Sequence, residues 1–110
     1  MITVKPINKD YYDGFVMEGH ADYAPHGQDV VCAGVSGALF TTYYALTYHE
    51  NEETKLQAVL ESGYAKITLD SPTIFTDFII DAFLETLIQI QTQYPGTIEI
   101  KGDANHEERL

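Results

Sequence analysis

The chain has 110 residues, 45% of them apolar, and carries 17 acidic against six basic residues, a formal net charge of −11. Its length and apolar content predict one domain with a modest core, and no stretch approaches the roughly 20 apolar residues that span a bilayer. The acidic balance argues against nucleic-acid binding, which requires clustered lysine and arginine. It serves either to attract a basic partner or only to confer solubility.

The start of the chain and its cysteine content predict a cytoplasmic protein. Residues 1–5 lack the basic and apolar regions of a signal peptide. The single cysteine, Cys32, cannot form an internal disulfide, and a free thiol is typical of a reducing compartment.

The first part of the chain predicts a β-hairpin. Apolar and polar residues alternate over residues 2–7, which indicates a strand. Residues 8–14 are rich in turn formers, including the pair Asp13-Gly14, so we expect the hairpin turn there. Residues 15–19 then form the second strand.

A loop and a helix follow this hairpin. His20 stands at the exit of the second strand, and residues 21–28 predict a loop containing Pro25 and Gly27. The spacing of apolar residues predicts a helix from Asp29 to about residue 48. Its core-facing stripe is expected to be Val31, Val35, Ala38 or Leu39, Thr42, and Ala45 or Leu46.

The second half of the chain repeats the order of strand, strand and helix. Residues 50–55 predict a polar linker, and residues 56–60 and 64–69 predict two strands joined at Ser62-Gly63. Ser71 followed by Pro72 predicts the N-cap and first residue of a second helix. Its core stripe is expected to be Phe75, Ile79, Ala82, Phe83, Thr86, Leu87 and Ile90.

The predicted elements assemble into one α+β domain. Tyr94-Pro95-Gly96 ends the second helix, and residues 97–101 predict a last strand. The order is therefore ββαββαβ, with two helices packed on a mostly antiparallel sheet. We expect a domain over residues 1–101 and a polar C-terminal tail over residues 102–110.

The chemistry of the chain is expected around Cys32. If Asp29 is the N-cap, Cys32 is the third helical residue, within the field of the free N–H groups and the helix dipole. That position stabilises a thiolate, and His20 precedes it as a candidate base. The expected site is a cysteine–histidine dyad, with the oxyanion held by N–H groups at the helix start.

Other interpretations of these residues remain open. Cys32 could be a buried structural thiol, and His26 lies on the same loop as a rival base. His20, His26 and Cys32 could also bind a metal with Asp22 or Asp29. One cysteine and no C-x-x-C pair argue against structural zinc, so we expect no metal and no cofactor.

Two further residues support the expected dyad. Asp29 would cap the helix and thereby fix the direction of Cys32. Ser36 lies one turn after Cys32 on the same side of the helix. It either forms a hydrogen bond within the site or is only a small residue that permits close packing.

The same segment resembles the signature of a known family. Gly19-His20-Ala21, Gly27, Asp29-Val30-Val31-Cys32 and Ser36 resemble the motif of the ribosomal-processing cysteine proteases, the Prp (YsxB-like) family. The spacing from His20 to Cys32 matches without an insertion. Asp22 stands where glycine is common, and Gly34 where alanine is usual.

The resemblance implies Cys32 as nucleophile and His20 as general base and acid. It implies removal of the N-terminal extension of large-subunit ribosomal protein number twenty-seven, with cleavage after a phenylalanine pair. It also implies a homodimer and a loop, residues 21–28, that is mobile until substrate binds. A phage homologue that processes a capsid or scaffold protein, or a non-catalytic ribosome-associated binding module, are the alternatives.

Overall fold

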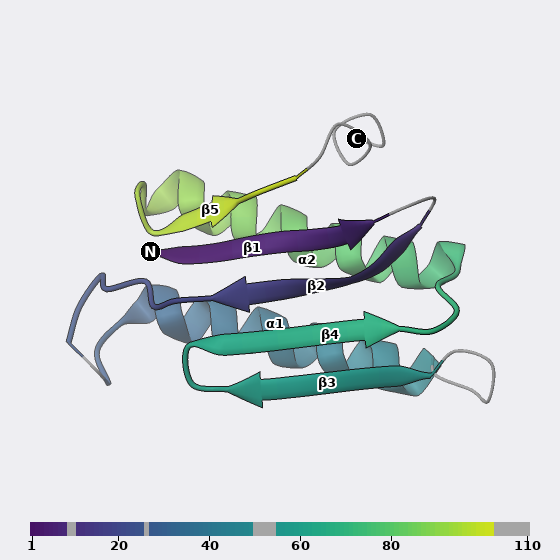
Figure 1. Cartoon of the computed structure of the whole chain (residues 1–110). Helices are drawn as coiled ribbons and strands as arrows, with labels where there is room; N and C mark the ends of the chain where they lie inside the picture. The colour runs from purple at the N-terminus through teal and green to yellow at the C-terminus, as the bar shows by residue number, and fades with distance from the viewer. Residues whose placement is uncertain (9–10, 26, 50–54, 103–110) are drawn as a thin grey trace.

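A computed structural model of the chain describes residues 1–8, 11–25, 27–49 and 55–102. It confirms an α+β fold in which both helices cover one face of a five-stranded sheet (Figure 1). The elements are β1 (Ile2–Asn8), β2 (Tyr12–Glu18), α1 (Val30–His49), β3 (Leu56–Glu61), β4 (Tyr64–Leu69), α2 (Ile74–Gln93) and β5 (Ile98–Ile100).

The strand order in the sheet is β3-β4-β2-β1-β5. All neighbouring strands are antiparallel except β1 and β5, which pair in parallel with Ile2 opposite Ile98. This topology brings the end of β2, the β3–β4 turn and the start of α1 to the same end of the sheet (Figure 1). The residues expected to carry the chemistry therefore meet at that end.

The predicted hairpin turn at Asp13-Gly14 is wrong, because both residues lie inside β2. Gly14 pairs with Ile7 on one side and Thr68 on the other. A Cβ on Gly14 would overlap the backbone of Ile67. The glycine therefore permits a close approach of β4, and the connection lies nearer residues 9 and 10, outside the described residues.

Helix α1 confirms the predicted start and the predicted core stripe. It begins at Val30, directly after Asp29. The buried residues recur at helical spacing and point toward the sheet and α2: Val31, Val35, Leu39, Thr42 and Leu46. The opposite side of α1 is left exposed.

One expectation about α1 needs correction. We expected no stretch apolar and long enough to cross a membrane. By length and composition alone, however, the helix Val30–His49 meets that requirement. The reason is that the helix contains no aspartate, glutamate, lysine or arginine. In the fold it is a core helix, because its buried stripe packs on the sheet.

Helix α2 begins two residues later than predicted. Its N-cap is Thr73, whose hydroxyl accepts a hydrogen bond from the Thr76 N–H while the Thr76 hydroxyl accepts one from the Thr73 N–H. This reciprocal capping box satisfies two donors and outcompetes a start at Ser71. Pro72 therefore precedes the helix instead of opening it.

The predicted core stripe of α2 is also partly wrong. The buried residues are Thr76, Asp77, Ile80, Phe83, Leu84 and Leu87, whereas Phe75 is 61% exposed. The buried carboxylate of Asp77 accepts a hydrogen bond of 2.8 Å from the Tyr12 N–H. This bond fixes the rotation of α2 against the start of β2. The polar Asp77 is therefore buried, although the spacing of apolar residues predicts a different buried face of the helix.

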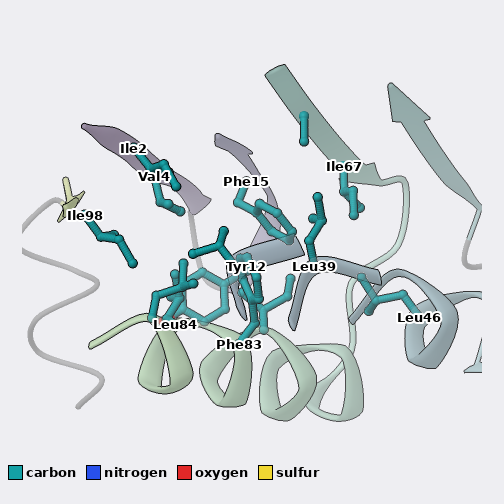
Figure 2. Packing of buried hydrophobic residues seen from close by; sticks show 14 of the residues in the cluster. Ile2, Val4, Tyr12, Phe15, Leu39, Leu46, Ile67, Phe83, Leu84 and Ile98 are labelled. Carbon is teal, nitrogen blue, oxygen red and sulfur yellow. The ribbon is translucent and has the colours of Figure 1, made fainter. Parts of the chain in front are cut away.

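The core lies between the sheet and the two helices, as Figure 2 shows for ten labelled side chains. Phe15 of β2 and Phe83 of α2 stack with ring centroids 4.7 Å apart, an offset arrangement that adds to the burial of both rings. Strands β3 to β5 agree with the predicted order. The linker residues 50–54 and the tail residues 103–110 fall outside the described residues.

Candidate active site

Cys32 is the third residue of α1 and carries a free, half-buried thiol. Asp29 caps the helix as the sequence predicts. Its Oδ1 accepts hydrogen bonds of 3.0 Å from the N–H groups of Val31 and Cys32. These bonds fix the first turn of α1 and the point from which the thiol projects.

The other carboxylate oxygen of Asp29 holds the preceding loop. Oδ2 accepts hydrogen bonds from the N–H groups of Tyr23 (2.8 Å) and Ala24 (3.2 Å). The Cys32 N–H is the main cause that lowers the pKa of Asp29 below its ordinary value, and the N–H groups of the other three residues add to it while desolvation opposes it. One carboxylate thus joins the loop to the helix that carries the thiol.

His20 is exposed at the end of β2, and its ring lies against the β3–β4 turn. A Cβ on Gly63 would come within 2.8 Å of Nε2 of His20. The Gly19 N–H also donates a hydrogen bond of 2.9 Å to the Gly63 carbonyl. Sequence reasoning treated Gly63 only as a turn residue, because nothing in the pattern shows what lies across the turn.

Two hollows meet at His20 and Cys32. The larger, about 510 Å³, lies on the side of the loop. Its lining comes from the segment of residues 20–36 and includes Asp22, Gly27 and Asp29. The smaller, about 240 Å³, lies on the side of the sheet and includes the β3–β4 turn. His20, Cys32 and Ser36 line both hollows. The structure therefore brings these three predicted residues together at the junction.

The two predicted glycines have different surroundings. Gly19 has a φ of +100°, and a Cβ there would meet the carbonyl of Met1, so any side chain would displace the N-terminal strand. Gly27 has a φ of +87° but open space around its missing Cβ. Its role is limited to the backbone conformation of the loop.

Asp22, which departs from the family motif two residues after His20, has an unusual backbone conformation. Asp22 has a φ of +54°, a conformation that glycine adopts without strain. Its exposed carboxylate lies 3.9 Å from the N-terminal amine. A glycine at this position would adopt the same φ without strain.

Three of the N–H groups at the start of α1, where the oxyanion is expected, already have acceptors. The N–H groups of Val31 and Cys32 are both engaged by Asp29 Oδ1. The Ala33 N–H donates to the Asp29 carbonyl at 3.1 Å, which is the first hydrogen bond of the helix. An occupied donor cannot stabilise a second oxygen with the same strength, so the three N–H groups nearest the thiol are already used.

The alternatives that involve His26 cannot be placed, because His26 lies outside the described residues. Among the residues that are described, no three histidine, cysteine, aspartate or glutamate side chains are grouped as ligands of a metal ion. His49 lies at the other end of α1, where Nε2 is 3.3 Å from the Thr73 hydroxyl.

Comparison with known proteins identifies the family. The family model of the cysteine protease Prp matches residues 1–99 of the chain. The chain belongs to the Prp family of cysteine proteases. The resemblance that the motif around Cys32 indicates is therefore confirmed.

Two ribosomal processing cysteine proteases named Prp are among the relatives. That of Staphylococcus aureus is 29% identical over 86 residues, which covers 77% of this chain and 81% of the relative. That of Bacillus subtilis is 42% identical over 50 residues, 46% of this chain and 45% of the relative. Family membership makes the chain an enzyme and argues against a non-catalytic module.

Solved structures, two of them of a Prp protease, share the fold. The S. aureus protease in complex with a covalently linked product peptide superposes with a TM-score of 0.83 at 27% identity, over 94% of this chain and 100% of that one. The same protease with a substrate peptide gives 0.77 at 26% identity, with the same coverage. SMU.848 of Streptococcus mutans gives 0.70 at 27% identity over 93% of each chain.

Proposed function

We propose that Cys32 and His20 form the catalytic dyad of this protease and remove the N-terminal extension of large-subunit ribosomal protein number twenty-seven. The observation that carries the assignment is the junction of the two hollows, which both residues line. A peptide that occupies both hollows would cross the thiol with residues on either side of the scissile bond. Such a placement is what endoproteolysis requires.

The mechanism follows from the two side chains. His20 accepts the proton of Cys32, and the thiolate attacks the peptide carbonyl. The C–N bond breaks as His20 returns the proton to the leaving amine. Water then hydrolyses the thioester, with His20 again as base. The support of His20 by Gly63 limits the positions of the ring that this exchange must use.

The substrate class is supported by charge and by the relatives. A chain of net charge −11 attracts basic proteins, and ribosomal proteins are basic. The S. aureus relative is named a ribosomal processing protease. We therefore place the enzyme in the cytoplasm, where its substrate is made.

The smaller hollow suits an aromatic residue before the scissile bond. Its lining includes the apolar side chains of Ile2, Met17, Val35, Leu39 and Ala65. The larger hollow contains two carboxylates, Asp22 and Asp29. We propose that a phenylalanine enters the first and that the residues after the cleavage point lie along the second.

A peptide digest tests this function directly. The purified chain is incubated with a peptide that carries the leader, the phenylalanine pair and the following basic residues, and the products are measured by mass spectrometry. Cleavage after the pair, lost when the second phenylalanine is replaced by aspartate, is the expected result. An intact peptide, in the presence of a thiol that alkylates normally, would refute the substrate.

We also propose that the enzyme is a homodimer formed through the outward face of α1. That face has no charged side chain in Val30–His49, so two chains of charge −11 can meet there without opposing carboxylates. Its first half carries small residues, Ala33 and Gly37, and its second half carries exposed aromatic ones, Phe40 and Tyr44. Two antiparallel copies would place the aromatic half of each against the small half of the other, as a twofold interface requires.

Oligomeric state in solution tests the interface. Light scattering coupled to size exclusion should give a dimer for the unaltered chain and a monomer for Tyr44→Glu. Val59→Glu is the matched control, because Val59 is an exposed apolar residue of β3, away from α1. A monomeric unaltered chain, or a dimer that both variants leave intact, would contradict the proposed interface.

A further inference from the structure

The oxyanion of this reaction needs a donor other than the N–H groups that Asp29 already engages. When the Sγ–C bond forms, the electron pair of the carbonyl double bond moves onto oxygen, and that charge must be met by hydrogen-bond donors already in place. The N–H groups of Val31, Cys32 and Ala33 are engaged by Asp29. The negative carboxylate of Asp29 also makes this end of the helix less favourable for a second anion.

Ser36 is a side chain beside Cys32 that could supply such a donor. It is exposed and lines both hollows together with Cys32 and His20. Among the described residues its hydroxyl forms no hydrogen bond. The hydroxyls of Thr42 and Thr47, on the same helix, are by contrast committed to backbone carbonyls at 2.8 Å.

The geometry of the helix directs Ser36 toward the thiol. Side chains of an α-helix tilt toward its N-terminus, so Ser36 covers the turn that carries Cys32. Residues four apart have Cβ atoms about 5–6 Å from one another. A tetrahedral carbon bonded to Sγ, with its oxygen about 2.7–3.1 Å from Oγ, fits within that separation.

We propose that the Ser36 hydroxyl is a catalytic residue that donates a hydrogen bond to the oxyanion of the tetrahedral intermediate. The proposal rests on Cys32 as the nucleophile. Ser36 keeps its proton throughout the step. When the C–N bond breaks, the electron pair on oxygen restores the carbonyl, the thioester remains on Sγ, and His20 protonates the amine.

The test compares Ser36→Ala with the unaltered enzyme in three assays. First, kcat for the leader peptide should fall by about 10²–10³-fold, the usual cost of one lost oxyanion donor, with KM unchanged. Second, affinity for a peptide aldehyde should fall by a similar factor, because Sγ adds to the aldehyde and leaves the same oxygen. Third, the rate of Cys32 alkylation by iodoacetamide should not change, because displacement of iodide forms no oxyanion.

Two further variants sharpen the comparison. Thr47→Ala is the matched control, since it removes a hydroxyl from the same helix at a position that lines neither hollow; it should leave all three assays unchanged. Ser36→Thr retains the hydroxyl and should recover most of the kcat that Ser36→Ala loses. Alanine raises helix propensity, so Ser36→Ala keeps its fold, and a thermal melt verifies this.

Three results would overturn the proposal. An unchanged kcat in Ser36→Ala would assign the oxyanion to another donor, such as the Val30 N–H. An alkylation rate that falls together with kcat would show that Ser36 acts on the thiol. A KM that rises while kcat stays constant would make Ser36 a substrate-binding residue.

Failure of the proposed substrate would be visible separately. If the unaltered enzyme does not cut the leader peptide, the peptide aldehyde and the hydrolysis of p-nitrophenyl acetate still pass through the same oxyanion. Both assays should then show the loss in Ser36→Ala and no loss in Thr47→Ala.

Discussion

The imidazole of His20 lies against the backbone of Gly63, so closely that a Cβ on Gly63 would come within 2.8 Å of Nε2. Gly63 belongs to a turn that is more than 40 residues further along the chain. The position of the proposed base thus depends on a residue that takes no part in the chemistry. The hydrogen bond from the Gly19 N–H to the Gly63 carbonyl holds the two segments together.

Gly63→Ala should lower activity far more than it lowers stability. The added methyl group displaces the His20 ring, and the φ of +75° adds a backbone strain of about 1 kcal/mol. Gly96→Ala is the control, because Gly96 has a φ of +84° and open space around its missing Cβ. Both variants should show similar losses in thermal stability, and only Gly63→Ala should show a reduced kcat. Equal activity in the two would mean that the ring position does not matter.

Cys32→Ala should abolish peptide cleavage and leave the fold nearly unchanged, because a methyl group replaces a half-buried thiol of similar size. Mass spectrometry of the leader peptide and a thermal melt are the measurements. Cleavage at a normal rate by the alanine variant would remove Cys32 as the nucleophile. Cys32→Ser is expected to bind the peptide without turning it over, since a hydroxyl ionises far less readily.

His20→Ala should reduce kcat by about 10²–10⁴-fold, the range for a lost general base. His26→Ala should have a much smaller effect. The rate of Cys32 alkylation by iodoacetamide, measured against pH in both variants, reports which imidazole activates the thiol. If His26→Ala is the more damaging change, the role of base passes to His26.

Stability should depend on Asp29 in a defined pH range. Its pKa is lowered by the hydrogen bonds from Cys32 and the loop, so the carboxylate contributes stability above the ordinary carboxyl pKa of about 3.9. That contribution is lost as the pH falls through the lower pKa of the folded state. Asp29→Asn should therefore melt below the unaltered chain by a constant interval between pH 5 and 7. The interval should shrink below about pH 4; an interval that grows on acidification would contradict the assignment.

The loop of residues 21–28 should close over a bound peptide. Tyr23 stacks edge-on against Tyr94 with centroids 4.9 Å apart, and Asp29 holds the N–H groups of Tyr23 and Ala24. We expect fast hydrogen exchange in the rest of this loop, and protection when a peptide inhibitor binds. Tyr94→Ala should speed exchange at Tyr23 in the free enzyme. Exchange that ligand leaves unchanged throughout the loop would exclude closure.

Most of the fold could be predicted because most of its helices, strands and turns are specified by residues that are close together in sequence. The stripe from Val31 to Leu46 and the turn at Ser62-Gly63 depend only on spacing and on neighbouring residues. The rotation of α2 escaped prediction because Asp77 is buried for a partner, the Tyr12 N–H, that is 65 residues away in sequence. Gly14 was mistaken for a turn residue for a similar reason, since the approach of β4 is invisible from its neighbours.

The candidate site was predicted where its residues lie close together in sequence. His20, Asp29, Cys32 and Ser36 fall within one segment, and α1 fixes the last three relative to one another. Gly63 and the sheet-side hollow belong to other strands and could not be found in this way. Capping by Asp29 was predicted, but its consequence for an oxyanion site was not, because a capping residue and an oxyanion site compete for the same N–H donors.

The parallel pairing of β1 with β5 has a consequence for the time at which the enzyme matures. Ile2 lines the sheet-side hollow, and its N–H donates to the Thr97 carbonyl, so the wall of this hollow is fixed by contacts between the two ends of the domain. During synthesis, the dyad segment leaves the ribosome long before β5 does. Because a pairing of such large sequence separation forms late in folding, a nascent chain would carry the thiol and the imidazole without a completed peptide site, and proteolysis would begin only after translation of the domain has ended.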